Sequence, residues 1–215
     1  MDNQYVLFWG PDMGSLPVQA LLLELGLPFR MQQVNFGHGE QRNPEYLGIN
    51  PTGKVPALRM PSGEIMTESA AMLIYLADSR PDLDLLPTTK DPRRAQALRW
   101  LLYMATEMYP TACHYYEPTA YAGNEDAAEN VALKGKQSFH AQCCYLETQM
   151  DPGQIFFLGD NFTAVDLYLS TMLDWHSDKS QLVVECPKIS VLADCVRARP
   201  AMQTARQTHK MNNCG

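Results

Sequence analysis

Hydrophobic and polar positions divide the chain into a first half that contains strands and a second half that contains helices only. An apolar, aromatic-rich run at 5–9 predicts a strand, and apolar residues at helical spacing predict a helix from Ser15 to Leu25, stopped by Gly26. A second strand is expected at 29–36, which makes a right-handed βαβ crossover. The other elements expected in this half are a short irregular helix, two short strands and a further helix, at 44–48, 55–58, 64–66 and 70–77.

Prolines among polar residues predict a linker at 81–91. After it the strand pattern disappears and long amphipathic stretches take over, with Pro110 expected to end or kink the first of them. The helices expected there are at 94–109, at 125–150, after the segment 158–166, and at 187–196 and 200–209. We therefore expect one α/β domain at 1–80 and one all-α domain at 92–215.

Composition narrows the possible functions. Of 215 residues, 46% are hydrophobic and 19% charged, which favours a folded core, and the formal net charge of -7 argues against nucleic acid and anionic membranes. Asp2-Asn3-Gln4 is not the basic start of a signal peptide. The six cysteines show no metal-ligand spacing and no CxxC motif, which is typical of a reduced, cytoplasmic protein.

The stretch 50–58 and the helix start after it predict a binding site for a small anionic peptide. Proline at the beginning of a strand removes one backbone donor beside an opening. If the Val55–Pro56 bond is cis, the amide and carbonyl of Val55 point outward and are free to pair with an extended peptide. The first N–H groups and the hydroxyl of Ser69 offer a site for a carboxylate. The alternative is a turn, a core strand and a capped helix with no ligand.

The two segments also resemble a known family. Residues 43–58 are NPEYLGINPTGKVPAL and residues 67–78 are TESAAMLIYLAD, a combination similar to the N-terminal domain of cytosolic glutathione S-transferases, most nearly the bacterial beta class. The resemblance runs through the whole chain, with a second signature near Asp166. It implies a thioredoxin-like α/β domain, an all-helical domain that supplies the substrate pocket, a homodimer, and glutathione as co-substrate.

The same resemblance implies which residues hold glutathione. Pro56 locks the bend, and the Val55 backbone pairs with the cysteinyl part. Ser69 holds the γ-glutamyl carboxylate, Glu68 receives the γ-glutamyl ammonium, and Lys54 meets a carboxylate; each role suits the charge of the residue. The alternatives are a solvated charge at Lys54 and a plain capped helix start at Glu68 and Ser69.

Conjugation by glutathione needs a thiolate, and a thiol with an ordinary pKa of about 8.5 is mostly protonated at neutral pH. Lowering that pKa by two units takes about 2.7 kcal/mol. One hydrogen bond to a charged acceptor contributes roughly 1.5–3 kcal/mol, and a helix N-terminus roughly 0.3–1 kcal/mol. One donor at the start of the first helix is therefore enough.

Ser15 is the candidate donor and catalytic residue. The segment Pro11-Asp12-Met13-Gly14-Ser15-Leu16 is similar to PGACSL of the beta class, but Gly14 occupies the position of the cysteine, and no cysteine precedes Cys113. This departure excludes cysteine-based mixed-disulfide chemistry from the N-terminal domain. The alternatives are that Ser15 is a plain N-cap, that the Gly14 N–H faces the sulfur, or that Tyr5 does so.

Beta-class members carry a histidine where this chain has Tyr109, after Trp100-Leu101-Leu102-Tyr103-Met104-Ala105-Thr106-Glu107-Met108. Tyr109 could donate to the sulfur or to the substrate, or line the cleft. The residues expected to form an apolar substrate pocket are Trp9, Met13, Met108, Tyr109, Tyr115 and Tyr116; the alternative is that they are core residues. No histidine has HExxH or triad companions, so we expect no metal.

A capping box is predicted at Thr163 and Asp166, with Phe162 as a hydrophobic staple against Leu167. We interpret this box as structural. The predicted function is glutathione S-transferase activity towards electrophilic, hydrophobic small molecules, and the sequence does not name the electrophile. The alternatives are a catalytically weak glutathione- or ligand-binding protein, and a glutathione-dependent isomerase or ether-cleaving enzyme.

Overall fold

The computed structural model describes residues 4–211, and within them the chain forms two compact units. The first unit comprises the described residues up to Leu86 together with those from Ala198 onward, and the second comprises Pro87–Arg197. The sequence placed the last helix in the second domain. In the structure this helix, α10 (Pro200–Met211), packs against α1 (Ser15–Glu24) of the first unit.

The first unit is built on a four-stranded sheet of order β2–β1–β3–β4. Its strands are β1 (Tyr5–Trp9), β2 (Phe29–Gln33), β3 (Ala57–Arg59) and β4 (Ile65–Met66). β1 and β2 are parallel, and β3 and β4 join antiparallel, which is the predicted thioredoxin-like arrangement. β2 ends three residues before its predicted end, because a 3₁₀ turn begins at Phe36, where the Asn35 side chain accepts a hydrogen bond from the His38 amide.

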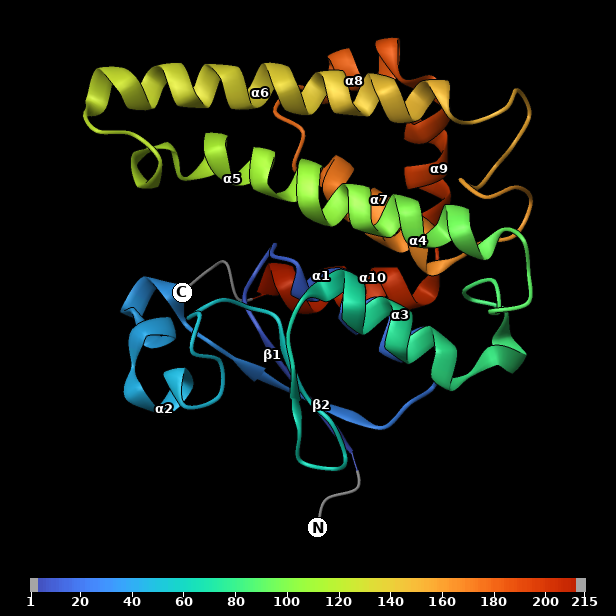
Figure 1. Cartoon of the computed structure of the whole chain (residues 1–215), viewed down its shortest axis with the longest axis horizontal. Helices are drawn as coiled ribbons and strands as arrows, with labels where there is room; N and C mark the ends of the chain where they lie inside the picture. The colour runs from blue at the N-terminus through green and yellow to red at the C-terminus, as the bar shows by residue number, and fades with distance from the viewer. Residues whose placement is uncertain (1–3, 212–215) are drawn as a thin grey trace. The chain divides into compact units, whose positions relative to one another are not determined.

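Apolar side chains alternate between the two faces of β1. Val6 and Phe8 join a buried cluster with Tyr46, Val55 and Ala57. α1 and α3 (Ser69–Ser79) pack together, α10 lies against α1, and these three helices gather on the opposite face of the sheet from α2 (Pro44–Leu47) (Figure 1). Short 3₁₀ turns at Phe36–His38, Glu40–Arg42 and Pro81–Leu83 connect these elements.

The second unit is helical. Its elements are α4 (Arg94–Tyr103), a π-helical turn (Met104–Met108), α5 (Tyr109–Tyr116), a 3₁₀ turn (Pro118–Ala120), α6 (Glu125–Thr148), α7 (Ala164–Asp174), α8 (Lys179–Glu185) and α9 (Pro187–Arg197). α5 and α6 lie side by side (Figure 1). None of the helices in residues 4–211 is long and apolar enough to cross a membrane.

Pro110 was expected to end or kink the first long helix, and in the structure it does not end it. The turn before it widens, and the Tyr109 amide donates to the carbonyl of Met104, five residues back. Proline in an α-helix clashes with the carbonyl four residues earlier. We attribute the continuation through Pro110 to this wider turn, which moves that carbonyl out of the α-helical position.

The capping box at the start of α7 is confirmed. Asp166 is fully buried, and its carboxylate accepts from the Thr163 amide at 2.7 Å, the Thr163 hydroxyl at 2.9 Å and the Phe157 amide at 2.7 Å. Burial raises the pKa of Asp166 to about 6 despite these three donors. The box therefore joins the loop at Phe157 to the helix start, in addition to capping the helix.

Candidate functional site

Strand register brings three predicted parts of the site to one end of the sheet. β3 and β4 pair Leu58 with Met66, so continuing the antiparallel register sets Pro56 opposite Glu68. β1 and β3 pair Phe8 with Ala57, which sets Gly10 beside Val55; a Cβ on Gly10 would lie 3.4 Å from the Val55 side chain. The bend at Pro56, the start of α3 and the loop leading to α1 are therefore neighbours.

The loop before Val55 is held by side chains that the sequence had not singled out. The carbonyl of Lys54 accepts from the Tyr46 hydroxyl at 2.6 Å and from the Asn50 side-chain amide at 2.7 Å. Asn50 is 2% exposed, and its Oδ1 accepts from the amide and the hydroxyl of Thr52. Both donors to Lys54 therefore fix the backbone, and the Lys54 side chain itself is exposed.

The Val55–Pro56 peptide bond is cis, as the peptide-pairing interpretation required. Among the hydrogen bonds of residues 4–211, the Val55 amide donates none and the Val55 carbonyl accepts none. These two groups are the pair that an extended peptide would use.

The start of α3 has an unusual backbone. Glu68 is the N-cap residue, with φ 66° and ψ 104°, which an L-residue rarely adopts. Its exposed side chain takes no part in capping the helix, while Ser69 begins the helix and is buried. The strain turns the chain sharply at the position where the sequence predicts a carboxylate and an ammonium to bind.

Ser15 begins α1 but is not its cap. Gly14 is the N-cap residue, and the Ser15 hydroxyl donates to the carbonyl of Gly10 at 3.1 Å. Ser15 is 0% exposed. The N-cap interpretation of Ser15 is therefore wrong, and as observed its hydroxyl proton is used within the loop.

His209, which the sequence reasoning left out, lies beside the same loop. Its Nδ1 accepts from the Asp12 amide at 3.1 Å, and its ring packs against Trp9 with centroids 4.8 Å apart. Burial lowers the pKa of His209 to about 4, so at neutral pH the ring is uncharged with its proton on Nε2. That Nε2–H is buried and has no hydrogen-bond partner among the described residues.

Comparison with known proteins gives the family. Residues 15–79 match the glutathione S-transferase N-terminal domain, and residues 112–208 match the glutathione S-transferase C-terminal domain. The chain is 31% identical over 210 residues to glutathione S-transferase GstA of Escherichia coli O157:H7, covering 93% of this chain and 96% of that protein. The chain belongs to the glutathione S-transferase family.

Solved transferase structures agree with this assignment. A glutathione transferase homologue from Sulfitobacter with bound glutathione is 28% identical, with a TM-score of 0.87 over 96% of this chain and 98% of that one. A bacterial beta-class glutathione S-transferase from Sphingomonas chungbukensis is 26% identical, with a TM-score of 0.80 over 95% and 98%. The predicted fold and the likeness to beta-class transferases are confirmed.

Tyr5, the third residue considered for the transferase sulfur, lies away from this end of the sheet. It begins β1, whereas the loop to α1 follows Trp9 at the other end, about 13 Å further along a strand. Tyr5 is 8% exposed, and burial, with its hydrogen bond to Tyr75, raises the pKa of its hydroxyl. It is a core residue of the transferase fold.

The pocket residues predicted for this transferase fall into both units. In the first unit Trp9 is buried against His209, and Met13 is partly buried. In the second unit Met108 is 0% exposed, which makes it a core residue, and burial raises the pKa of the Tyr115 hydroxyl.

Trp175 contacts all three tyrosines that were predicted for the pocket in the helical unit. The ring of Tyr109 meets the Trp175 ring edge-on with centroids 4.9 Å apart. The hydroxyls of Tyr115 and Tyr116 both donate to the Trp175 carbonyl, the second at 3.0 Å. Trp175 is the C-cap residue of α7 and lies outside any motif, so no sequence pattern pointed to it.

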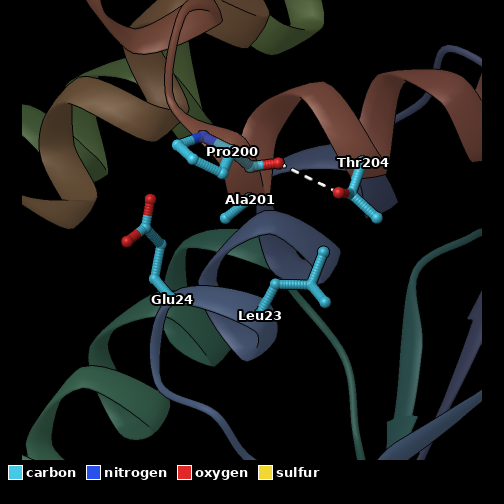
Figure 2. A pocket seen from close by; sticks show the side chains of 5 residues that line it. All are labelled: Leu23, Glu24, Pro200, Ala201 and Thr204. Carbon is cyan, nitrogen blue, oxygen red and sulfur yellow. Dashed lines mark hydrogen bonds between the residues drawn. The ribbon is translucent and has the colours of Figure 1, made fainter.

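A shallow depression between α1 and α10 is not part of this site. Figure 2 shows its lining residues, Leu23, Glu24, Pro200, Ala201 and Thr204. The Glu24 carboxylate is held by two hydrogen bonds from Arg199, at 2.7 and 2.9 Å, and the Thr204 hydroxyl donates to the Pro200 carbonyl. The first pair joins α1 to the start of α10, and the second bond lies within α10.

Proposed function

We propose that this transferase conjugates the thiolate of reduced glutathione to electrophilic, hydrophobic small molecules. The observation that carries the proposal is the joint placement of the Val55 backbone, the cis bond to Pro56 and the strained Glu68–Ser69 start of α3 at one end of the sheet. An extended tripeptide has a backbone to pair with Val55 and a carboxylate for the start of α3.

In the proposed complex each residue has a distinct task. The Val55 amide and carbonyl pair with the cysteinyl unit, Ser69 and its N–H hold the γ-glutamyl carboxylate, and Glu68 accepts from the γ-glutamyl ammonium. Lys54 meets the remaining carboxylate from its exposed position. This arrangement leaves the sulfur near the loop that leads to α1.

We propose Ser15 as the residue that stabilises the thiolate. Its hydroxyl must turn from the Gly10 carbonyl to the sulfur when glutathione binds, exchanging a neutral hydrogen bond for a charge-assisted one. The Gly14 N–H is the alternative donor, because it lies at the start of the same helix. Ser15→Ala separates the two donors.

Calorimetry with reduced glutathione tests the binding half of the proposal. Ser69→Ala and Glu68→Gln are expected to weaken binding roughly tenfold or more each, since each removes a hydrogen bond to a charged group. Ser62→Ala, in an exposed turn of the same unit, is the matched control and should bind like the wild type. Absence of binding heat at millimolar glutathione would end the proposal.

A steady-state assay with an aryl halide tests the chemical half. If Ser15 stabilises the thiolate, Ser15→Ala should lower kcat/KM roughly ten- to hundredfold and raise the pH at which activity reaches half its maximum. An unchanged profile would exclude Ser15 and leave the Gly14 N–H and Tyr109 as candidates. Tyr109→Phe in the same assay tests whether Tyr109 takes part.

The second candidate function is glutathione or ligand binding with little turnover. The buried, already bonded hydroxyl of Ser15 is the observation that favours it. Saturable glutathione binding without turnover would select this alternative. We also propose a homodimer, which light scattering on the full chain would test.

A further inference from the structure

Four ionisable side chains meet where α6 approaches the end of α8, within the helical unit. His140 and Cys144 lie one turn apart on α6, Glu185 is the last residue of α8, and Cys186 follows it. The Cys144 Sγ lies 3.5 Å from the Cys186 Sγ and 3.5 Å from the His140 Nε2. The Glu185 carboxylate lies 3.0 Å from the same nitrogen.

A chain of hydrogen bonds determines where the proton of His140 lies. The Asp178 amide donates to His176 Nδ1 at 3.0 Å, so the neutral ring of His176 carries its proton on Nε2. Burial lowers the pKa of His176, which keeps that ring neutral. His176 Nε2 therefore donates to His140 Nδ1, 3.0 Å away, and His140 carries its own proton on Nε2, facing Glu185 and Cys144. The Gln181 side-chain amide also lies 3.2 Å from this nitrogen, and it donates to the other Glu185 oxygen at 2.9 Å.

This proton bears on what the cluster can do. His140, Cys144 and Glu185 have ligand atoms within 4.8 Å of one another, a spacing that suits a metal ion. A metal, however, needs the lone pair of the nitrogen it binds, and the His140 nitrogen at this position is an N–H. The Cys144 sulfur instead accepts from this N–H and from the Cys186 thiol, each at 3.5 Å, which places a nucleophilic sulfur beside a second thiol.

The two sulfurs also differ in access. Cys144 is partly exposed, whereas Cys186 is buried. Burial and the nearby Cys144 raise the pKa of Cys186 to about 12, which keeps it a thiol that donates to the Cys144 sulfur. Cys186 is the C-cap residue of α8, with φ -130° and ψ 60°. Its amide donates to the Leu182 carbonyl at 2.8 Å and its carbonyl accepts from the Ser190 amide of α9 at 3.1 Å, so its thiol lies at the junction of the two helices.

We propose that Cys144 and Cys186 are a reversible redox pair that a hydroperoxide converts into a disulfide. The Cys144 thiolate attacks the peroxide oxygen, the O–O bond breaks, and an alcohol or water leaves, which makes Cys144 a sulfenic acid. The Cys186 sulfur then attacks the Cys144 sulfur, the S–O bond breaks, and water leaves with the Cys186 proton. In sum, two thiols and one hydroperoxide give one disulfide, one alcohol and one water.

The geometry fits the second step. The sulfurs must close from 3.5 Å to about 2.05 Å, a movement of about 1.5 Å. The bond would close a loop across 42 positions and tie α6 to the junction of α8 and α9. Loops of this length restrict the unfolded chain, so the oxidised protein should melt at a higher temperature than the reduced one.

Mass spectrometry on the intact, full-length protein tests the pair. The reduced protein is freed of reductant, treated with one equivalent of hydrogen peroxide, and alkylated. It should lose the mass of two hydrogen atoms, and peptide mapping should link Cys144 to Cys186. Cys144→Ser and Cys186→Ser should abolish the link. Cys143→Ala, the sequence neighbour, and Cys195→Ser, another partly exposed thiol, should retain it.

The role of His140 is measured as the pH dependence of Cys144 alkylation by iodoacetamide. His140→Leu should slow alkylation at pH 7 on the order of tenfold by removing the N–H, and His140→Gln, which keeps an N–H, should restore most of the rate. Equal rates in all three proteins would overturn this role.

Three results would overturn the pair itself: Cys144 oxidised beyond sulfenic acid with no cross-link, a cross-link through Cys143, or one equivalent of zinc released only when Cys144 is alkylated.

Discussion

Protonation of His209 should weaken the attachment of α10 to the first unit. The neutral ring accepts the Asp12 amide at Nδ1 and packs on Trp9, and it is wholly buried. Because the ring is buried, its charged form is disfavoured, and the pKa of His209 is lowered from 6.5 to about 4. A second proton would go to Nδ1, where it would break the hydrogen bond from the Asp12 amide and leave two N–H groups facing each other.

The sign and size of the effect follow from linkage. A lowered histidine pKa means that the unfolded chain binds the proton more readily, so stability is fully present above pH 6.5 and is lost as the pH falls towards 4. The expected loss is about 0.8 kcal/mol at pH 6 and about 2 kcal/mol at pH 5. The raised pKa of Asp166 acts in the opposite direction in the second unit, with a gain of about 1.4 kcal/mol at pH 5.

Because the two groups oppose each other, a comparison of variants is needed. His209→Asn keeps an acceptor near the position of Nδ1 and cannot gain a proton. We expect it to be less stable than the wild type at pH 7.5, through lost packing on Trp9, and to lose less stability on acidification. Urea unfolding at pH 7.5, 6 and 5, followed by tryptophan fluorescence, measures the difference.

The refuting result is a constant gap. If the wild type and His209→Asn differ by the same free energy at every pH, His209 does not titrate in this range and the argument from burial fails. If the gap narrows by about 2 kcal/mol between pH 7.5 and 5, the argument holds.

Three further predictions concern backbone and capping. Glu68→Gly should raise the free energy of unfolding by about 1 kcal/mol, because it relieves a positive φ, while calorimetry shows weaker glutathione binding; a loss of stability would contradict the strain. Gly53→Ala should lower the free energy of unfolding by about 1–3 kcal/mol, since φ is 63° and the new Cβ would lie 2.9 Å from the Gln41 carbonyl oxygen. If the variant unfolds in urea with the same free energy as the wild type, this prediction is wrong. Thr163→Ala should lower the Tm by about 2–4 °C through loss of the capping box. Differential scanning calorimetry measures the Tm, and an unchanged value would contradict this prediction.

Much of the first unit followed from local signals. A continuous apolar, aromatic-rich run broken at Gly10 located β1 without error, and Gly26, with φ 61°, ends α1 as its type predicts. The capping box at Thr163 and Asp166 was equally local. Such features depend on residues close in sequence, and a single chain shows them directly.

Features that depend on distant contacts were missed. His209 is separated from Asp12 by 197 positions, and α10, which carries it, belongs to the first unit and not to the predicted second domain. Trp175 meets Tyr116 across 59 positions. The role of Ser15 as a cap was wrong because its hydroxyl found the Gly10 carbonyl, a partner that loop geometry alone provides. The glutathione contacts and the substrate pocket stay predictions.

The widened turn at Met104–Met108 amounts to one residue more than a regular helix holds. Each residue advances an α-helix by about 100°, so shortening this turn by a single deletion would swing the whole aromatic face of α5 around its axis. Tyr109 would then point away from Trp175, and neither tyrosine hydroxyl would reach the Trp175 carbonyl. The angular setting of this aromatic face is thus held in the length of one turn, so an insertion or deletion there would reorient the face without altering any side chain.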